Sequence, residues 1–227
     1  MPRARAPSPE APPPEAAREG RFSRLEPALR KARLVEATLR CLQHYGFQGT
    51  SIRRICAEAG VSIGLINHHY RSKDELVAET YLTITQRITG QLRQAIDAAA
   101  PDARSRLGAF FRASFSPELL DPALLDAYLA FWGAVKSAEA ITRAHDESYG
   151  EYRATISQAL MQLAREQGWR RFDSDLAAIA LSAMLDGLWL EYGLNPRTFS
   201  PAQGVQVCEA WIDGLVGGGY ERFARGS

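Results

Sequence analysis

The chain has 227 residues, of which 46% are hydrophobic and 23% charged, and its formal net charge is +1. This composition is typical of a globular protein with a sizeable core. Three cysteines, Cys41, Cys56 and Cys208, have no paired or metal-like spacing, which argues against a disulfide framework, and we expect reduced thiols in a cytoplasmic protein. No apolar run reaches the roughly 18 residues of a membrane span, and the N-terminus lacks the apolar segment of a signal peptide.

The charges are distributed unevenly along the chain. Residues 1–75 carry 13 basic and 8 acidic side chains, whereas residues 76–227 carry 14 basic and 18 acidic ones. A basic front and an acidic rear suit a protein that docks on phosphate groups by one face only.

The first 22 residues are expected to be a disordered tail. They hold six of the twelve prolines, several alanines and mixed charges. A segment of this composition buries too little apolar surface to fold by itself.

An amphipathic helix is predicted from Pro27 to about Tyr45. Its apolar face is formed by side chains three and four residues apart, Leu34, Val35, Thr38, Leu39 and Leu42. Gly46 is placed to end this helix. We expect the helix to support the segment that follows it, with Phe47 filling the junction.

Residues 50–76 have the pattern of two short helices joined by a tight turn. Ser51, or the threonine before it, is a plausible N-cap for the first helix. Gly60 can adopt a positive φ at the end of that helix, the next valine can fill the angle, and Ser62 can cap a second helix that runs to about His69. This arrangement is typical of a helix-turn-helix element whose second helix enters the major groove of DNA.

The same stretch resembles the TetR-type transcriptional regulators. The family pattern is matched at Thr50, Ser51, Ile55, Ala59, Gly60, Val61, Ser62, Gly64, His69, Tyr70, Lys73 and Leu76. The resemblance implies an all-α fold, with a three-helix DNA-binding domain over residues 23–72 and a helical ligand-binding and dimerisation domain over residues 73–227. It also implies a homodimer on a palindromic operator in double-stranded DNA, because two such elements about 34–36 Å apart span successive major grooves.

Ten residues of this element are candidates for DNA contacts. We assign phosphate contacts to Ser51, Arg53, His69 and Lys73, and groove contacts to Ser62, Ile63, Leu65, Asn67 and His68, with Gly64 allowing close approach of the backbone.

Two positions depart from the family pattern. Cys56 stands where the family has alanine, and Asn67 stands where it usually has a tyrosine that contacts a phosphate. Asn67 can instead read a base, for example through two hydrogen bonds to adenine. Tail arginines such as Arg18 and Arg21 are candidates for minor-groove or backbone contacts, although we favour the alternative of a solvated tail without a role.

A long helix is predicted from Lys73 to about Pro101. Its apolar positions are Leu76, Tyr81, Ile84, Ile88, Leu92 and Ile96. Asp74 and Glu75 stand in the first turn, where the helix dipole favours acids, but Lys73 does not fit this rule. A phosphate held between the lysine and the free backbone N–H groups would explain its presence. In the TetR-like architecture this helix joins the two domains, and a ligand changes its tilt.

The remaining chain is predicted to contain only helices, over residues 102–115, 121–136, 138–167, 174–192 and 201–225. The helix over 174–192 is apolar almost all round, so we expect its own domain to bury one side and a second copy of the chain to bury the other. Together with the last helix it would form a four-helix contact across a two-fold axis.

Six residues are candidates for an effector site: Tyr128, Trp132, Tyr149, Tyr152, Asp186 and Trp189. Aromatic side chains at helical spacing usually belong to a core, but a carboxylate inside an apolar helix needs a partner or a proton. Two interpretations of Asp186 stay open. One is a structural ion pair with Lys136, Arg143 or Arg153, and the other is a cage in which the carboxylate and aromatic rings hold an organic cation.

Residues 127–136 and 185–194 resemble the C-terminal domain of BetI-like repressors, which control choline and glycine betaine metabolism. The resemblance implies a repressor that a choline-like effector releases from DNA. The alternative is a constitutive or partner-controlled regulator without a small-molecule effector. We do not expect an enzyme, a cofactor or a metal, because His68 and His69 are adjacent rather than at i, i+4 spacing, and no nucleophile or phosphate-loop motif is present.

Overall fold

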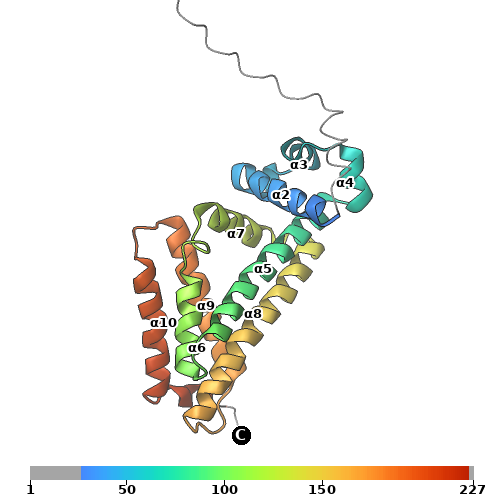
Figure 1. Cartoon of the computed structure of the whole chain (residues 1–227). Coiled ribbons are helices and arrows are strands. Elements are labelled where there is room, and N and C mark those ends of the chain that lie inside the picture. Colours follow the sequence, from blue (N-terminus) through green and yellow to red (C-terminus); the bar gives the residue numbers. More distant parts are fainter. Residues whose placement is uncertain (1–26, 225–227) are drawn as a thin grey trace, which may run out of the picture.

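The structure, a computed structural model, describes residues 27–224, in which the regular secondary structure is helical apart from one antiparallel bridge between Phe172 and Ala224. The elements are α2 (Pro27–Gly49), α3 (Ile52–Ala59), α4 (Ile63–His69), α5 (Lys73–Ala98), α6 (Ala103–Ser114), α7 (Pro122–Ala134), α8 (Glu139–Glu166), α9 (Ser174–Leu194), α10 (Pro201–Val216) and the 3₁₀ helix η1 (Gly219–Phe223). Helices α2 to α4 form one end of the molecule, and α5 to α10 form the larger body (Figure 1). The predicted all-α fold is confirmed, while the tail over residues 1–22 lies outside the described residues.

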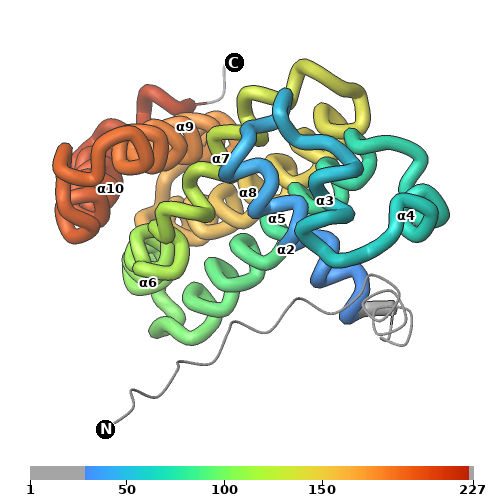
Figure 2. Tube along the Cα trace, turned by 90° about the horizontal axis from the view of Figure 1, so that it is seen from above, coloured from blue at the N-terminus to red at the C-terminus, as the bar shows by residue number. Residues whose placement is uncertain are grey.

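Helices α2, α3 and α4 share a small hydrophobic core with the first turn of α5. Its buried members are Leu34, Ala37, Cys41, Ile55, Cys56, Val61, Ile66 and Leu76. Seen from this end of the molecule, α4 lies at the outer rim (Figure 2). The core therefore fixes α5 to the helix pair that precedes it, and the predicted packing of α2 against α3 and Val61 is confirmed.

The end of α2 is more complex than predicted. Gly46 has a positive φ of 61°, which breaks the helix as expected, but one further turn continues to Gly49. Thr50 holds this turn, because its backbone N–H and its hydroxyl both donate to the Gly46 carbonyl, at 3.1 and 2.7 Å. The positive φ explains the glycine at position 46.

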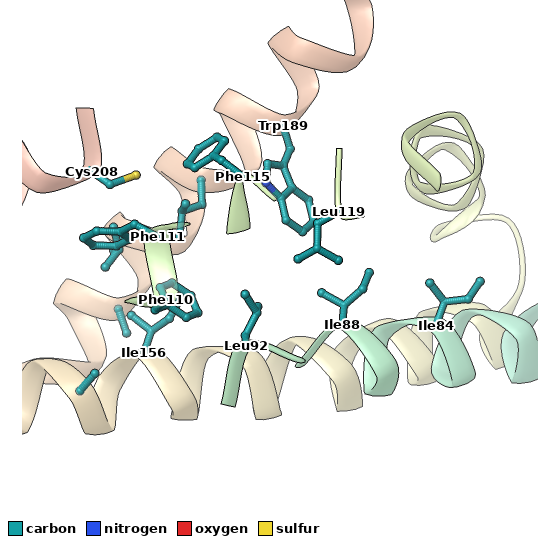
Figure 3. Packing of buried hydrophobic residues seen from close by; sticks show 14 of the residues in the cluster. Ile84, Ile88, Leu92, Phe110, Phe111, Phe115, Leu119, Ile156, Trp189 and Cys208 are labelled. Carbon is teal, nitrogen blue, oxygen red and sulfur yellow. The ribbon is translucent and has the colours of Figure 1, made fainter. Parts of the chain in front are cut away.

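The larger core lies between α5, α6, α7, α8, α9 and α10. Leu92 of α5 lies close to Phe110 of α6 and Ile156 of α8, whereas Ile88, one turn earlier on α5, lies nearer to Leu119 and Trp189 (Figure 3). The Trp189 indole N–H donates to the Ser114 carbonyl at 3.0 Å, so its polar atom is satisfied within this apolar setting. Helix α5 contacts α2 as well as α6 and α8, so it connects the small core to the rest of the body.

Helix α9 is apolar on its exposed side as well as on its buried one. Exposed large apolar side chains line α9 and α10, namely Leu176, Ile179, Leu190, Leu194, Val207 and Val216. By length and composition alone, α9 could also cross a membrane, although Asp186 and Glu191 interrupt its apolar residues, so that no uninterrupted apolar run of about 18 residues is present there. In the structure α9 packs against α7, α8 and α10 as a core helix does.

The last helix is shorter than predicted. It ends at Val216 rather than near residue 225, and Gly217 and Gly218 separate it from η1, which begins at Gly219. Gly218 has a φ of 113°, a conformation that glycine adopts without strain. The chain then turns back, and Phe223 and Ala224 reach the loop between α8 and α9, where Asp173 N–H donates to the Phe223 carbonyl at 2.7 Å.

Candidate functional site

Helices α3 and α4 are joined by a turn with the predicted geometry. The Ser51 hydroxyl caps α3 by accepting from the Arg54 N–H at 3.3 Å. Gly60 ends α3 in the left-handed conformation, with φ 69° and ψ 40°, and Val61 N–H donates to the Cys56 carbonyl at 3.0 Å. A side chain at position 60 would be strained, so the glycine sets the angle between the two helices.

One face of α4 is anchored and the opposite face is open. Ile66 is fully buried in the small core, whereas Ile63 is 43% exposed and Asn67 and His68 are exposed. Gly64 has no atom within 4 Å of the position that a Cβ would occupy. Polar donors and an apolar side chain beside an open backbone suit contact with base edges and the thymine methyl group. The assigned contacts of these residues stay predictions.

Two residues of α4 differ from expectation. Ser62 occupies the N-cap position of α4, but its hydroxyl makes no capping hydrogen bond, so the expected cap was wrong. The Ser62 hydroxyl therefore does not bond to the backbone N–H groups at the start of α4. Leu65 is half-buried and packs against the small core, so it supports α4 rather than extending outward as we expected.

Lys73 lies at the start of α5, as predicted, but its ammonium already has partners. Its Nζ donates to the Phe47 carbonyl at 3.1 Å and lies 3.8 Å from the centre of the Phe47 ring. A cation–π contact and a hydrogen bond explain a lysine at this helix start without a phosphate. The Ser72 hydroxyl caps the helix by accepting from Glu75 N–H at 3.1 Å.

A second candidate site is a pocket inside the larger body. It is lined from α5, α7, α8 and α9 by Thr85, Ile88, Thr89, Tyr128, Ser148, Tyr149, Tyr152, Asp186 and Trp189. Five of the six residues predicted for an effector site are among them. The cavity volume is about 20 Å³, which is room for about one water molecule.

Asp186 is the charged group of this pocket. The Tyr149 hydroxyl donates to its Oδ2 at 2.8 Å. Burial raises the pKa of Asp186 from 3.8 to about 6, against the opposing effects of the Tyr149 hydrogen bond and the positive charge of Arg153. Burial and the neighbouring carboxylate raise the pKa of Tyr149 as well, so this tyrosine is a neutral donor.

The remaining pocket walls are aromatic. The Tyr128 ring lies edge-on to Trp189, with centroids 5.8 Å apart, and the Tyr149 ring lies edge-on to Tyr152 at 6.1 Å. Burial is the main cause that raises the pKa of Tyr128 and of Tyr152, so both present neutral rings. Neutral aromatic rings around one carboxylate form an environment that favours a cation.

Two expectations about this site need correction. Trp132 does not line the pocket and instead contacts Tyr128 from the side, with ring centroids 5.9 Å apart. No salt bridge joins Asp186 to a basic side chain within residues 27–224. Arg143 pairs with Glu139 instead, and Arg153 lies over the Tyr149 ring at 5.2 Å.

Sequence reasoning missed the contribution of α5 to the pocket. Thr85, Ile88 and Thr89 belong to the inward face of α5, and we had interpreted that face only as a connecting element. The signal was a run of threonines within an apolar stripe. Tyr81, one turn earlier, is fully buried, and burial raises its pKa to about 12 against the opposing effect of the nearby Ser148 hydroxyl.

Two family models match the chain. The model described as "BetI-type transcriptional repressor, C-terminal" matches residues 103–217, and the model described as "Bacterial regulatory proteins, tetR family" matches residues 34–80. The second match covers α3, α4 and the start of α5. The first covers α6 to α10, and thus the α7, α8 and α9 walls of the pocket.

Individual transcriptional regulators are also similar to this chain in sequence or structure. The HTH-type transcriptional regulator BetI of Vibrio vulnificus (strain YJ016) is 28% identical over 172 residues, which are 75% of this chain and 84% of the relative. The crystal structure of a candidate transcriptional regulator from Pseudomonas aeruginosa PAO1 is 68% identical, with a TM-score of 0.87 over 89% of this chain and 98% of that one. A candidate regulator from Saccharomonospora viridis, crystallised with choline, is 24% identical, with a TM-score of 0.69 over 82% and 96% of the two chains.

Proposed function

Because the chain belongs to the TetR family of bacterial transcriptional regulators and carries a BetI-type C-terminal domain, we propose that it is a homodimeric repressor that an organic cation releases from a palindromic operator. It is a transcriptional regulator and not an enzyme. Residues 23–72 form the proposed DNA-binding domain and residues 73–227 the proposed effector and dimerisation domain. The protein acts on DNA and therefore works in the cytoplasm.

The DNA-binding role rests on the open face of α4. Asn67 and His68 lie on this face beside Gly64, and Arg53 is exposed on α3. In the proposal, Arg53, Ser51 and His69 contact phosphates while Asn67, His68, Ser62 and Ile63 enter the major groove. Lys73 stabilises the contact between the start of α5 and Phe47. A phosphate contact is only a secondary role for this residue.

Dimerisation rests on the apolar stripe of α9 and α10. Ile179 is 48% exposed and Leu194 is 68% exposed, although both are large apolar side chains. A second copy packed on this stripe would form a four-helix contact about a two-fold axis. The two α4 helices would then reach successive major grooves on one face of the duplex.

The cation as effector is supported mainly by one observation, a carboxylate that lies among neutral aromatic rings and forms no salt bridge with a described residue, although the charge of Arg153 acts on it from a distance. Such a site stabilises a cation by charge and by cation–π contacts. The choline that the S. viridis regulator holds supports the same class of ligand. Tyr128, Tyr149, Tyr152, Asp186 and Trp189 are the proposed contacts.

Release from DNA follows from the size of the pocket. An organic cation is larger than one water, so its entry must push the lining helices apart. One of these is α5, whose first turn is fixed in the small core by Leu76. A ligand that binds the expanded state shifts the equilibrium toward it, and the helix pair then loses the spacing that the operator requires.

Isothermal titration calorimetry with two ligands of nearly equal shape tests the effector. Choline carries a trimethylammonium group, whereas 3,3-dimethylbutanol has an uncharged tert-butyl group in its place. We expect saturable binding of choline to the wild-type protein, no binding of the alcohol, and loss of choline binding in Asp186→Asn. Equal binding of both ligands, or choline binding that survives Asp186→Asn, would contradict the cation site.

The alternative is a regulator that responds to no small molecule. The small cavity volume favours it. Thermal unfolding with a panel of quaternary ammonium compounds separates the two, because a ligand that binds the folded state raises its apparent stability. If no member of the panel raises the unfolding temperature or weakens operator binding, a constitutive or partner-controlled regulator becomes the better interpretation.

A further inference from the structure

A second cavity lies at the end of the larger body that is remote from α3 and α4. It has a volume of about 460 Å³ and opens between the last turns of α5, the first turn of α6 and the second half of α8. Its polar lining includes Arg93, Asp97, Arg106, Thr155, Gln158 and Arg165. None of these residues lines the aromatic pocket around Asp186.

We propose that this cavity is a binding site for a small oxyanion, a molecule that carries carboxylate or phosphate groups. Three guanidinium groups from three different helices, Arg93 on α5, Arg106 on α6 and Arg165 on α8, line one cavity. Guanidinium groups bind carboxylates and phosphates through paired, charge-assisted hydrogen bonds. The site goes beyond the proposed DNA and cation sites and does not depend on either.

One buried N–H donor of the Arg106 guanidinium has no hydrogen-bond partner among the described residues. Its Nη1 donates to Gln162 Oε1 at 2.8 Å, but its Nε is buried and has no partner within the described residues. Gln162 is fixed in turn, because its Nε2 donates to the Pro101 carbonyl at 2.6 Å. The guanidinium is thus held in place with an unsatisfied donor, which is costly unless an acceptor is supplied.

The other two arginines differ in how strongly they are engaged. Arg93 Nε donates to Thr155 Oγ1 at 3.1 Å, and its Nη2 lies 4.0 Å from Glu151. The Arg165 side chain has no hydrogen bond or ion pair with any residue in 27–224 and is exposed. Arg165 can therefore move over a ligand without breaking an existing contact.

The charge balance of the lining favours an anion. The three arginines face one acid, Asp97. Two further acids lie outside the lining, Glu151, which pairs with Arg93, and Glu166, which accepts from the Ala103 N–H at 3.0 Å, so the surplus of positive charge belongs to the lining residues themselves. The cavity volume falls within the range of small-molecule sites.

The position of the site allows a bound anion to act on the tilt of α5. An anion that bridges Arg93 and Arg165 would fasten the end of α5 to α8, and α5 continues to the small core at its other end. Binding there would favour one tilt of α5 over another, so the protein would respond to two inputs of opposite charge.

Calorimetry on the full-length protein tests the site directly, without DNA or a cationic ligand. The probes are citrate for carboxylates and pyrophosphate for phosphates, titrated at constant ionic strength in chloride buffer. We expect saturable binding of at least one probe, and the stronger probe identifies the ligand group. Arg165→Ala should weaken binding roughly tenfold to a hundredfold, the loss of a charge-assisted hydrogen-bond pair.

Two variants provide controls. Arg87→Ala removes an exposed arginine of α5 that does not line the cavity, and it should leave binding unchanged. Asp97→Asn removes the one acid of the lining and should tighten binding of an anion severalfold. Absence of saturable binding by both probes, an equal loss in Arg87→Ala and Arg165→Ala, or weaker binding in Asp97→Asn would each overturn the proposal. Failure of choline to bind would leave this result untouched.

Discussion

Replacing Asp186 by asparagine should make the free protein more stable at neutral pH. Folding raises the pKa of this carboxyl from 3.8 to about 6, because burial disfavours its charged form. The folded state therefore holds the proton more tightly than the unfolded state, and ionisation between pH 3.8 and 6 favours unfolding. An asparagine amide of the same shape does not ionise, and it can still accept the hydrogen bond from Tyr149.

The size of the effect follows from the two pKa values. A difference of about two pKa units corresponds to about 3 kcal/mol at a pH well above 6, and most of it develops between pH 4 and pH 8. For a chain of this length, that is roughly 5 to 10 °C in unfolding temperature. The wild-type protein thus retains a destabilising charge in its core, as expected where the charge serves to bind a ligand.

Thermal unfolding of both proteins across this pH range measures the effect. The stability of the Asp186→Asn variant relative to the wild-type protein should rise mainly between pH 4 and pH 6 and level off toward pH 8. Choline should reduce the difference at pH 8 by stabilising only the wild-type protein. Asp126→Asn, which removes an exposed acid from α7, should show no such gain. A stability gap that is the same at pH 4 and pH 8 would refute the reasoning, since it would mean that the carboxyl is not ionised in a buried site.

Four further outcomes are expected. Asn67→Ala should relax sequence preference at one base pair per half-site, with a loss of about 1 to 3 kcal/mol in operator binding measured by fluorescence anisotropy, and a uniform loss on all sequences would rule out base reading. The logarithm of operator affinity should fall steeply with that of salt concentration, whereas a flat dependence would contradict the phosphate contacts. Ile179→Glu should elute as a folded monomer in size-exclusion chromatography, and a persisting dimer would place the interface elsewhere. Gly204→Ala should lower the unfolding free energy by about 1 to 3 kcal/mol, because its Cβ would lie 2.6 Å from the Phe115 ring, whereas Gly150→Ala, with no atom within 4 Å, should not destabilise the protein.

The sequence predicted the helices well because their signals are local. The stop at Gly60 and the N-cap at Ser51 act within a single turn, and both have the predicted geometry. The spacing of Leu76, Tyr81, Ile84, Ile88 and Leu92 likewise predicted the buried face of α5, whatever that face packs against. The TetR resemblance was carried by the same short stretch, and the family matches confirm it.

Contacts between distant segments could not be predicted in this way. The lysine at position 73 appeared to need a phosphate, but its ammonium is met by Phe47, which lies 26 residues earlier in the chain. Trp132 shares a helix face with Tyr128, yet four residues correspond to about 6 Å along a helix axis, and the pocket lies at the level of Tyr128 only. Helical periodicity gives the face of a residue but not the height at which another helix crosses it.

The structure also indicates how the pocket can act on the DNA-binding end by two routes rather than one. The sequence suggested α5 alone, but α7 carries Tyr128 and packs against α2. At that contact the Gln43 side chain of α2 donates to the Ala123 carbonyl in the first turn of α7, at 2.6 Å. A cavity of about 20 Å³ cannot admit a cation unless Tyr128 or the facing residues of α5 retreat. Because α2 and the first turn of α5 share the small core, we expect displacement of either wall to be passed on to the helix pair α3 and α4, which the proposed repressor requires.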